Sequence, residues 1–338
     1  MNKTEQGVLH QSKLIHLLIH ILLLLTFCLT HPVIAETLSA NTASHEKNTQ
    51  KHHIYTIFSP DNTLHANIIQ KLSENLKLKR SDIIILNVTP EEKIKTVDSN
   101  TDLIIGIGNA GMQSADKNYP KTKKLFISTD PNKYSLDKNK NKYDAILYMA
   151  QPYCRQIPFI KLLNRQWKTI GLLNSREKPI DTNTIQQCAK KHGLETYIVN
   201  TTSNEGLKDN IKDVLNHSDI LLALPDKNIY NSKSIKNILL TSYRHRKPVI
   251  AFSKNFADAG ALASIYSSTE QIAQSASNLI EQYFESGQRF KKLVNYPQAF
   301  DVSINRQVFR ALDLSIPELD ELKQTLIYSE TEKAGKLQ

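Results

Sequence analysis

The feature that most constrains the fold is an alternation of short apolar runs with longer amphipathic stretches. In the first half of the chain, residues 53–58, 83–88, 102–107 and 125–128 are rich in aliphatic, β-branched and aromatic side chains, and residues 64–76 have helical periodicity. Short, nearly continuous apolar strands are typical of parallel sheets that are buried on both faces. We therefore expect a parallel sheet here, covered by helices on both sides.

Two connections in this half carry predictions of their own. Residues 90–97 are expected to form a helical link between the second and third strands. The third strand ends in GIGNAG at 106–111, where glycine allows a tight turn and a close backbone approach before another helix begins.

The same alternation restarts beyond Ala150. Two such runs predict two doubly wound α/β lobes with parallel sheets, because each sheet needs its own covering helices. The helices and strands expected in the second run are 152–165, 169–173, 182–192, 195–199, 207–215, 220–223, 232–243 and 248–252.

The last third of the chain predicts a hinge. A strand at 260–265 is followed by a long helix at 269–284 and a closing strand at 299–304. We expect the helix to return to the first lobe and the last strand to the second, so that the chain crosses between lobes three times. Lobes joined in this way move as rigid bodies about a few hinge residues. The expected division is 53–150 plus 267–287 for lobe 1, 151–266 plus 288–318 for lobe 2, and 319–338 as a tail whose order stays open.

The N-terminus has the features of an export signal. A weakly basic start is followed by an apolar run at 14–29, and Val33 and Ala35 are small enough for the positions before a signal-peptidase cut. The apolar run is shorter than the ~20 residues that span a bilayer, although an uncleaved anchor is the alternative. We expect a signal peptide at 1–35 and a flexible leader at 36–52. Because bulky Phe27 precedes Cys28, the sequence does not match a lipidation site, and an unlipidated periplasmic protein is predicted.

Charge and cysteine content limit the partners. The formal net charge of +10 comes from lysines and arginines scattered along the chain, without interleaved aromatic residues or a nucleic-acid-binding motif. We therefore expect a solvated basic surface and no nucleic-acid partner.

After the signal, two cysteines remain, Cys154 and Cys188. An oxidising compartment permits a disulfide between them, and two half-buried thiols are the alternative. Neither cysteine has a second ligand at metal-binding spacing, so no metal is expected.

Several segments, in this order and spacing, resemble one family. They are DLIIGIG at 102–108, KTIGLL at 168–173, DILLALPD at 219–226, PVIAFS at 248–253, GALAS at 260–264, FDVSIN at 300–305 and ALDLSIP at 311–317. Together they resemble bacterial ABC-transporter substrate-binding proteins with the type I periplasmic-binding-protein fold. The resemblance implies a two-lobed protein that binds amino acids or other small organic solutes and works with a membrane ABC permease. Many relatives carry a glycine-rich segment at the first crossing, but residues 138–148 differ from it, so ligand contacts from that segment are not carried over.

Strand ends supply the candidate binding residues, because ligands of open parallel sheets lie beyond the carboxyl ends of the strands. Asn109 is expected either to help bind a carboxylate or carbonyl or to cap its helix. Asp226 is expected either to pair with a ligand amine or to cap a turn near Asn228. The candidates are Ser59, Asp61, Asn109, Ala110, Ser128 and Thr129 in lobe 1, and Gln151, Tyr153, Asn174, Ser175, Asp226, Ser253 and Asp258 in lobe 2.

These patterns favour solute capture between two lobes by a monomeric protein. A ligand-sensing accessory protein of a membrane receptor, without transport, is the alternative. The chain has no G-x-S-x-G, H-E-x-x-H or P-loop motif, so we expect neither an enzyme nor a cofactor.

Overall fold

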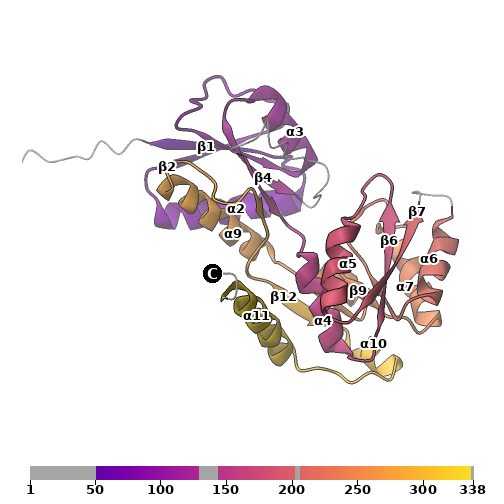
Figure 1. The fold of residues 1–338 in the computed structure, drawn as a ribbon. Coiled ribbons are helices and arrows are strands. Elements are labelled where there is room, and N and C mark those ends of the chain that lie inside the picture. The colour runs from indigo at the N-terminus through magenta and orange to yellow at the C-terminus, as the bar shows by residue number, and fades with distance from the viewer. Residues whose placement is uncertain (1–50, 129–143, 202–205, 336–338) are drawn as a thin grey trace, which may run out of the picture. The chain divides into compact units, whose positions relative to one another are not determined.

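The computed structural model describes residues 51–128, 144–201 and 206–335, whose helices and strands are drawn in Figure 1. The expected signal peptide at 1–35, nearly all of the leader at 36–52, and Thr129 lie outside these ranges. The described residues contain two α/β lobes, each built on its own six-stranded sheet. This confirms the predicted fold class.

The first sheet has the strand order β11-β5-β4-β3-β1-β2, with parallel pairing throughout. Its central strands are apolar on both faces, and each face is covered by helices. The strands are β1 (His52–Ile57), β2 (Ile83–Val88), β3 (Leu103–Ile107), β4 (Lys123–Ser128), β5 (Ala145–Tyr148) and β11 (Val294–Asn295).

Three helices cover the first sheet. Helices α2 (Thr63–Lys79) and α9 (Thr269–Glu285) share one core cluster, and α3 (Gly108–Asn118) packs in the other. Figure 1 shows α9, from late in the chain, beside α2 from its beginning. Ser268 begins α9 with a reciprocal capping box to Gln271, which satisfies two backbone donors of the first turn. Helix α9 therefore packs on the first sheet.

The second sheet has the order β12-β10-β9-β8-β6-β7, and only the pair β10–β12 is antiparallel. The strands are β6 (Thr169–Ser175), β7 (Glu195–Thr201), β8 (Ile220–Leu222), β9 (Val249–Ala251), β10 (Ala263–Tyr266) and β12 (Asp301–Ile304). The helices are α4 (Tyr153–Leu163), α5 (Thr182–Lys191), α6 (Leu207–Asn216), α7 (Ile235–Arg244), α8 (Lys254–Asp258), α10 (Arg306–Ala311) and α11 (Leu319–Gly335). They divide between two core clusters on opposite faces.

The prediction of a helical link at 90–97 is wrong. The segment has no helix or strand, because side chains of the neighbouring helix take its backbone groups. Ser114 Oγ donates a hydrogen bond to the carbonyl oxygen of Pro90 at 2.8 Å, and the Ile94 N–H donates to Tyr119 Oη at 2.7 Å. With these groups satisfied by tertiary contacts, the segment needs no internal helical bonds.

The expected boundary at residue 288 also differs from the structure. Strand β11 pairs with β5 of the first sheet, with Val294 opposite Ile146, although 288–318 had been assigned to lobe 2. A strand of two residues is too short to show periodicity, so the sequence carried no signal for it. The other boundaries of the expected division stay a prediction.

Part of the C-terminal tail and both cysteines pack in the second lobe. Leu322 and Leu326 of α11 are buried in the core cluster that also contains α4 and α5. Cys154 of α4 and Cys188 of α5 form a disulfide, with their Cα atoms 5.3 Å apart. Within the described ranges, no helix combines the length and the apolar character needed to span a bilayer.

Candidate functional site

The carboxyl ends of β6 and β8 bring Ser175 and Asp226 together. Ser175 is the last residue of β6, and its Oγ donates a hydrogen bond to Asp226 Oδ2 at 2.5 Å. The backbone N–H of Asn228 donates to Asp226 Oδ1 at 2.9 Å. Asp226 is 8% exposed and Ser175 is fully buried. No Lys, Arg or His of the described ranges lies within ion-pair distance of Asp226, so only neutral donors hold this buried carboxylate.

A pocket of about 30 Å³ opens beside Asp226. That volume accommodates one small polar group or a water molecule. Three segments form it: the start of α4, the loop after β6 and the loop after β8. The lining residues are Ala150, Gln151, Tyr153, Gln156, Leu173, Lys178, Pro179, Ile180, Leu224, Pro225 and Asp226.

Gln156 is the polar residue of α4 that lines this pocket. It is 2% exposed, and its Nε2 donates a hydrogen bond to the carbonyl oxygen of Gln151 at 2.7 Å. Its Oε1 is buried and has no hydrogen-bond partner among the described residues. On the opposite loop, Lys178 Nζ donates to the carbonyl oxygen of Pro225.

The three segments in which the chain crosses between the two sheets meet next to the pocket in one chain of hydrogen bonds. Gln151, from the first crossing, donates through Nε2 to Ser267 Oγ of the second crossing at 2.8 Å. Ser267 Oγ donates in turn to the carbonyl oxygen of Ala299, just before β12, at 2.7 Å. Arg155 Nη1 donates to Gln151 Oε1 at 2.7 Å. Gln151 therefore lines the pocket and also bonds to a second crossing segment.

The other predicted residues of lobe 2 have local roles. Asn174 donates to Asn200 Oδ1 at 2.7 Å and accepts the Ile180 N–H at 3.0 Å. Ser253 caps α8, and the exposed Asp258 pairs with Lys254 at 2.7 Å. Of the seven lobe 2 candidates, Gln151, Tyr153 and Asp226 thus line the pocket, and Ser175 is hydrogen-bonded to Asp226.

In the first lobe, two of the predicted residues lie at the start of α3. Asn109 and Ala110 are in its first turn, and its N-cap, Ile107, makes no side-chain capping bond, so Asn109 does not cap the helix. Gly108 has φ of 65°, and a Cβ there would lie 2.4 Å from Cε1 of His65. The His65 ring therefore packs directly on the glycine.

The other polar groups of the first lobe differ in burial. His65 Nδ1 is buried and has no partner among the described residues, and burial lowers the pKa of His65. Ser59 is half-buried, whereas Asp61 is exposed and its neighbour Asn62 caps α2. Ser128 ends β4, but its side chain and all of Thr129 fall outside what the structure describes.

A comparison with protein families identifies the family of this chain. Residues 89–322 match the family model described as ABC transporter substrate binding protein. The chain belongs to this family. The match includes both halves of the pocket and all three chain crossings, and members of the family bind solutes for transport. A comparison with curated proteins finds no match.

Solved structures share the fold of this substrate-binding protein. A conserved domain protein from Vibrio cholerae is 20% identical, with a TM-score of 0.54 and coverage of 80% of this chain and 96% of that one. A domain from Streptococcus pneumonia, solved in complex with L-Trp, is 18% identical, with the same TM-score and coverage. A ligand-free, open substrate-binding protein with adhesive properties from Clostridium difficile is 14% identical, with a TM-score of 0.56 and coverage of 80% and 96%.

Sequence reasoning missed two residues of the substrate-binding protein, Arg155 and Gln156. Both lie inside the predicted helix at 152–165, and both are buried. The available signal was a charged and an amide side chain next to the apolar run 157–160, since such residues are seldom buried without partners. The direction in which the helix presents them depends on packing against distant segments.

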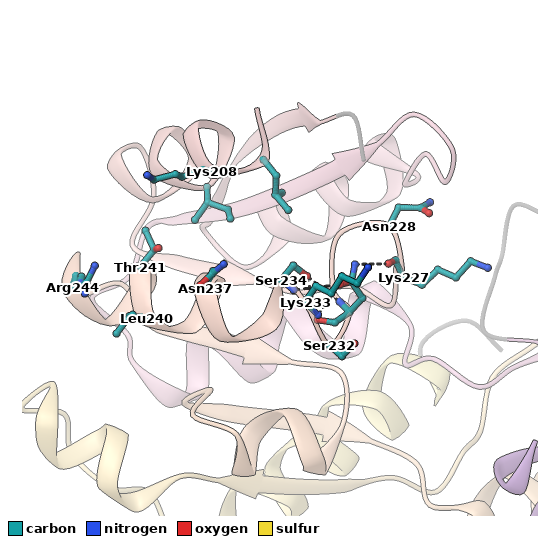
Figure 2. A pocket seen from close by; sticks show the side chains of 13 residues that line it. Lys208, Lys227, Asn228, Ser232, Lys233, Ser234, Asn237, Leu240, Thr241 and Arg244 are labelled. Carbon is teal, nitrogen blue, oxygen red and sulfur yellow. Dashed lines mark hydrogen bonds between the residues drawn. The ribbon is translucent and has the colours of Figure 1, made fainter. Parts of the chain in front are cut away.

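A larger pocket of the substrate-binding protein, about 940 Å³, lies between α6 and α7 and is shown in Figure 2. Lys208, Lys227, Lys233 and Arg244 line it, and all four are exposed. It includes none of the predicted site residues, and no lining residue has a buried polar atom that lacks a partner. We therefore assign the candidate site to the smaller pocket beside Asp226, where buried polar groups converge. Among the described residues, no cluster of three or more His, Cys, Asp or Glu side chains could hold a metal.

Proposed function

We propose that this chain is an exported solute-binding protein that captures a small organic solute carrying an amino group and delivers it to an ABC permease. The observation that carries the proposal is the buried carboxylate of Asp226, which is held only by the Ser175 hydroxyl and the Asn228 N–H within the described chain. A solute with an ammonium group would supply the missing positive charge.

The physical reason is the cost of burying a charge. A carboxylate removed from water is unfavourable unless a countercharge and hydrogen bonds compensate it. Neutral donors supply hydrogen bonds, whereas an ammonium supplies both a hydrogen bond and a countercharge, and charge-assisted hydrogen bonds are the stronger kind. The pocket beside Asp226 accommodates a group of that size. The L-Trp bound to the Streptococcus pneumonia protein is a solute of this class.

Capture would couple to hinge motion. A ligand favours a closed form only when it binds that form more tightly than the open one. The α3 turn of the first lobe, with Asn109 and His65, supports a second contact for the solute, because helix N-terminal N–H groups favour a carboxylate. An amino acid would then place its ammonium at Asp226 and its carboxylate at this turn.

The test is isothermal titration calorimetry on the mature chain, residues 36–338, with a panel of amino acids, simple amines and carboxylic acids without an amine. We expect at least one amino-containing solute to bind, and Asp226→Asn to weaken it by ten-fold or more. Asp258→Asn is the matched control, because Asp258 is exposed and paired with Lys254. The proposal fails if no member of the panel binds, or if Asp226→Asn and Asp258→Asn have equal affinities.

Export to the periplasm without lipidation is part of the same proposal. Expression of the full chain in a bacterium with a periplasm should yield a soluble product that begins at Glu36, identified by mass spectrometry of the osmotic-shock fraction. A product that keeps residues 1–35 and sediments with membranes would contradict it.

A further inference from the structure

The two polar atoms of the Gln156 side-chain amide have different environments: Nε2 bonds to the first crossing, and Oε1 has no partner among the described residues. Its Nε2 donates to the carbonyl oxygen of Gln151, and a carbonyl can only accept, so the orientation of the amide is determined. The Oε1 therefore points away from Gln151. It is buried and has no partner among the described residues.

A buried acceptor without a donor is unusual in a folded protein, because its hydrogen bond to water has been lost and not replaced. Gln156 and Asp226 both line the pocket, so one small pocket has two hydrogen-bond acceptors. Asp226 supplies the negative charge, and Gln156 supplies a neutral oxygen. This pair suits a group that is positively charged and also carries more than one N–H.

The other half of the amide reaches the hinge. Gln156 holds the backbone of Gln151, whose side chain donates to Ser267, and Ser267 donates to Ala299. These bonds join the first, second and third crossings. A change in the position of Gln156 therefore acts on Gln151 first and on the other crossings through it.

We propose that Gln156 is a specificity-determining residue whose Oε1 accepts an N–H of the solute ammonium and whose Nε2 positions Gln151 in the hinge. The inference rests on the proposed function for the presence of an amino solute. It adds that the site selects N–H-bearing ammonium over fully methylated ammonium, and that this selection and hinge closure depend on one side chain.

The experiment compares each amino acid that binds the wild type with its N,N,N-trimethyl betaine, which keeps the positive charge and has no N–H. Calorimetry should show at least ten-fold weaker binding of the betaine to the wild type. Gln156→Met removes the acceptor at similar volume and should reduce this preference to under three-fold. Gln307→Met, at an exposed glutamine of α10, is the control and should keep the wild-type preference.

A second variant separates the two halves of the amide. Gln156→Glu keeps an acceptor oxygen but cannot donate to Gln151. We expect it to retain a preference for the N–H-bearing solute while losing the decrease in radius of gyration that small-angle X-ray scattering should show when the wild type is saturated.

The possible failures are distinguishable. If the wild type binds an amino acid and Gln156→Met keeps the full preference over the betaine, a water satisfies Oε1; this inference is then wrong while the proposed function stands. If Gln156→Glu closes like the wild type, the coupling to the hinge is wrong. If no amino solute binds the wild type at all, the proposed function fails, and this inference fails with it.

Discussion

The guanidinium of Arg155 binds the carboxylate of Glu330 through two hydrogen bonds, from Nε to Oε1 at 2.6 Å and from Nη2 to Oε2 at 2.8 Å. Arg155 also donates to the carbonyl oxygen of Pro297 at 2.9 Å and lies 4.5 Å from the ring centroid of Phe300. The C-terminal helix α11 is thereby attached to α4 and to the third chain crossing.

We expect Glu330→Gln to lower the free energy of unfolding by about 2 kcal/mol. The substitution leaves the buried guanidinium without its countercharge, which costs about 3–5 kcal/mol at a fully buried pair; Glu330 is about a third exposed, so water recovers part of that cost. Urea denaturation followed by circular dichroism measures it. Asp313→Asn is the control, because the Arg246–Asp313 pair is exposed, and its loss should cost less than about 0.5 kcal/mol. Equal costs would show that burial of Arg155 does not strengthen the pair.

The disulfide between Cys154 and Cys188 should stabilise the second lobe. It closes a loop with a sequence separation of 34 residues, for which loop-closure entropy predicts a contribution of about 3–4 kcal/mol. We expect a reducing agent to lower the thermal midpoint of the wild type. The Cys154→Ala/Cys188→Ala variant should have the lower midpoint already and should not respond to reductant. A thermal midpoint of the wild type that does not change with reductant would contradict a stabilising role of the disulfide.

Tyr230 should make stability depend on alkaline pH. Burial, followed by the charge of Asp226, raises the pKa of Tyr230 above its ordinary value of 10.0. The contribution of Tyr230 to the free energy of unfolding is therefore complete below pH 10. Above pH 10 it is lost progressively until pH passes the raised folded pKa, because the phenol ionises first in the unfolded chain. We expect the wild type to lose about 1.4 kcal/mol more than Tyr230→Phe between pH 9 and pH 11. Tyr243→Phe, which removes an exposed phenol, should follow the wild type.

Gly108→Ala, in the first lobe, should lower the free energy of unfolding more than Gly193→Ala, in the second lobe. Both glycines have φ of 65°, so both variants have a left-handed alanine that costs about 1–2 kcal/mol. A Cβ at Gly108 also meets Cε1 of His65 at 2.4 Å, whereas Gly193 has nothing within 4 Å. Urea denaturation should give at least ~1 kcal/mol of additional cost at Gly108. The difference should shrink in a His65→Ala background, and an unchanged difference would exclude the ring as its cause.

Sequence periodicity predicted most strands because each buried strand is apolar on both faces whatever lies next to it. Thus a strand was predicted at 102–107, and the fully buried β3 spans Leu103–Ile107. The predictions were wrong where tertiary contacts replace local ones. Residues 90–97 have no helix because Ser114 and Tyr119 bind their backbone, and Val294–Asn295 is a strand only because β5 lies beside it.

The candidate site shows the same division. Asp226 and Ser175 were predicted because strand ends of a parallel sheet meet at one edge. Gln156 and Arg155 were missed because both lie within a helix, where only packing decides which face is buried against the hinge. The partners of Arg155 and of Gln151 are 175 and 116 residues away in sequence, at Glu330 and Ser267.

The sequence by itself determined two wound lobes, the order of most of their strands along the chain and the edge at which a ligand group would lie, because side-chain period and strand direction are local properties. The tertiary structure decided which polar groups are buried together where the chain crosses between the sheets, and which acceptor lacks a donor among the described residues. Those depend on chain crossings that bring distant segments into contact, and no local pattern records them.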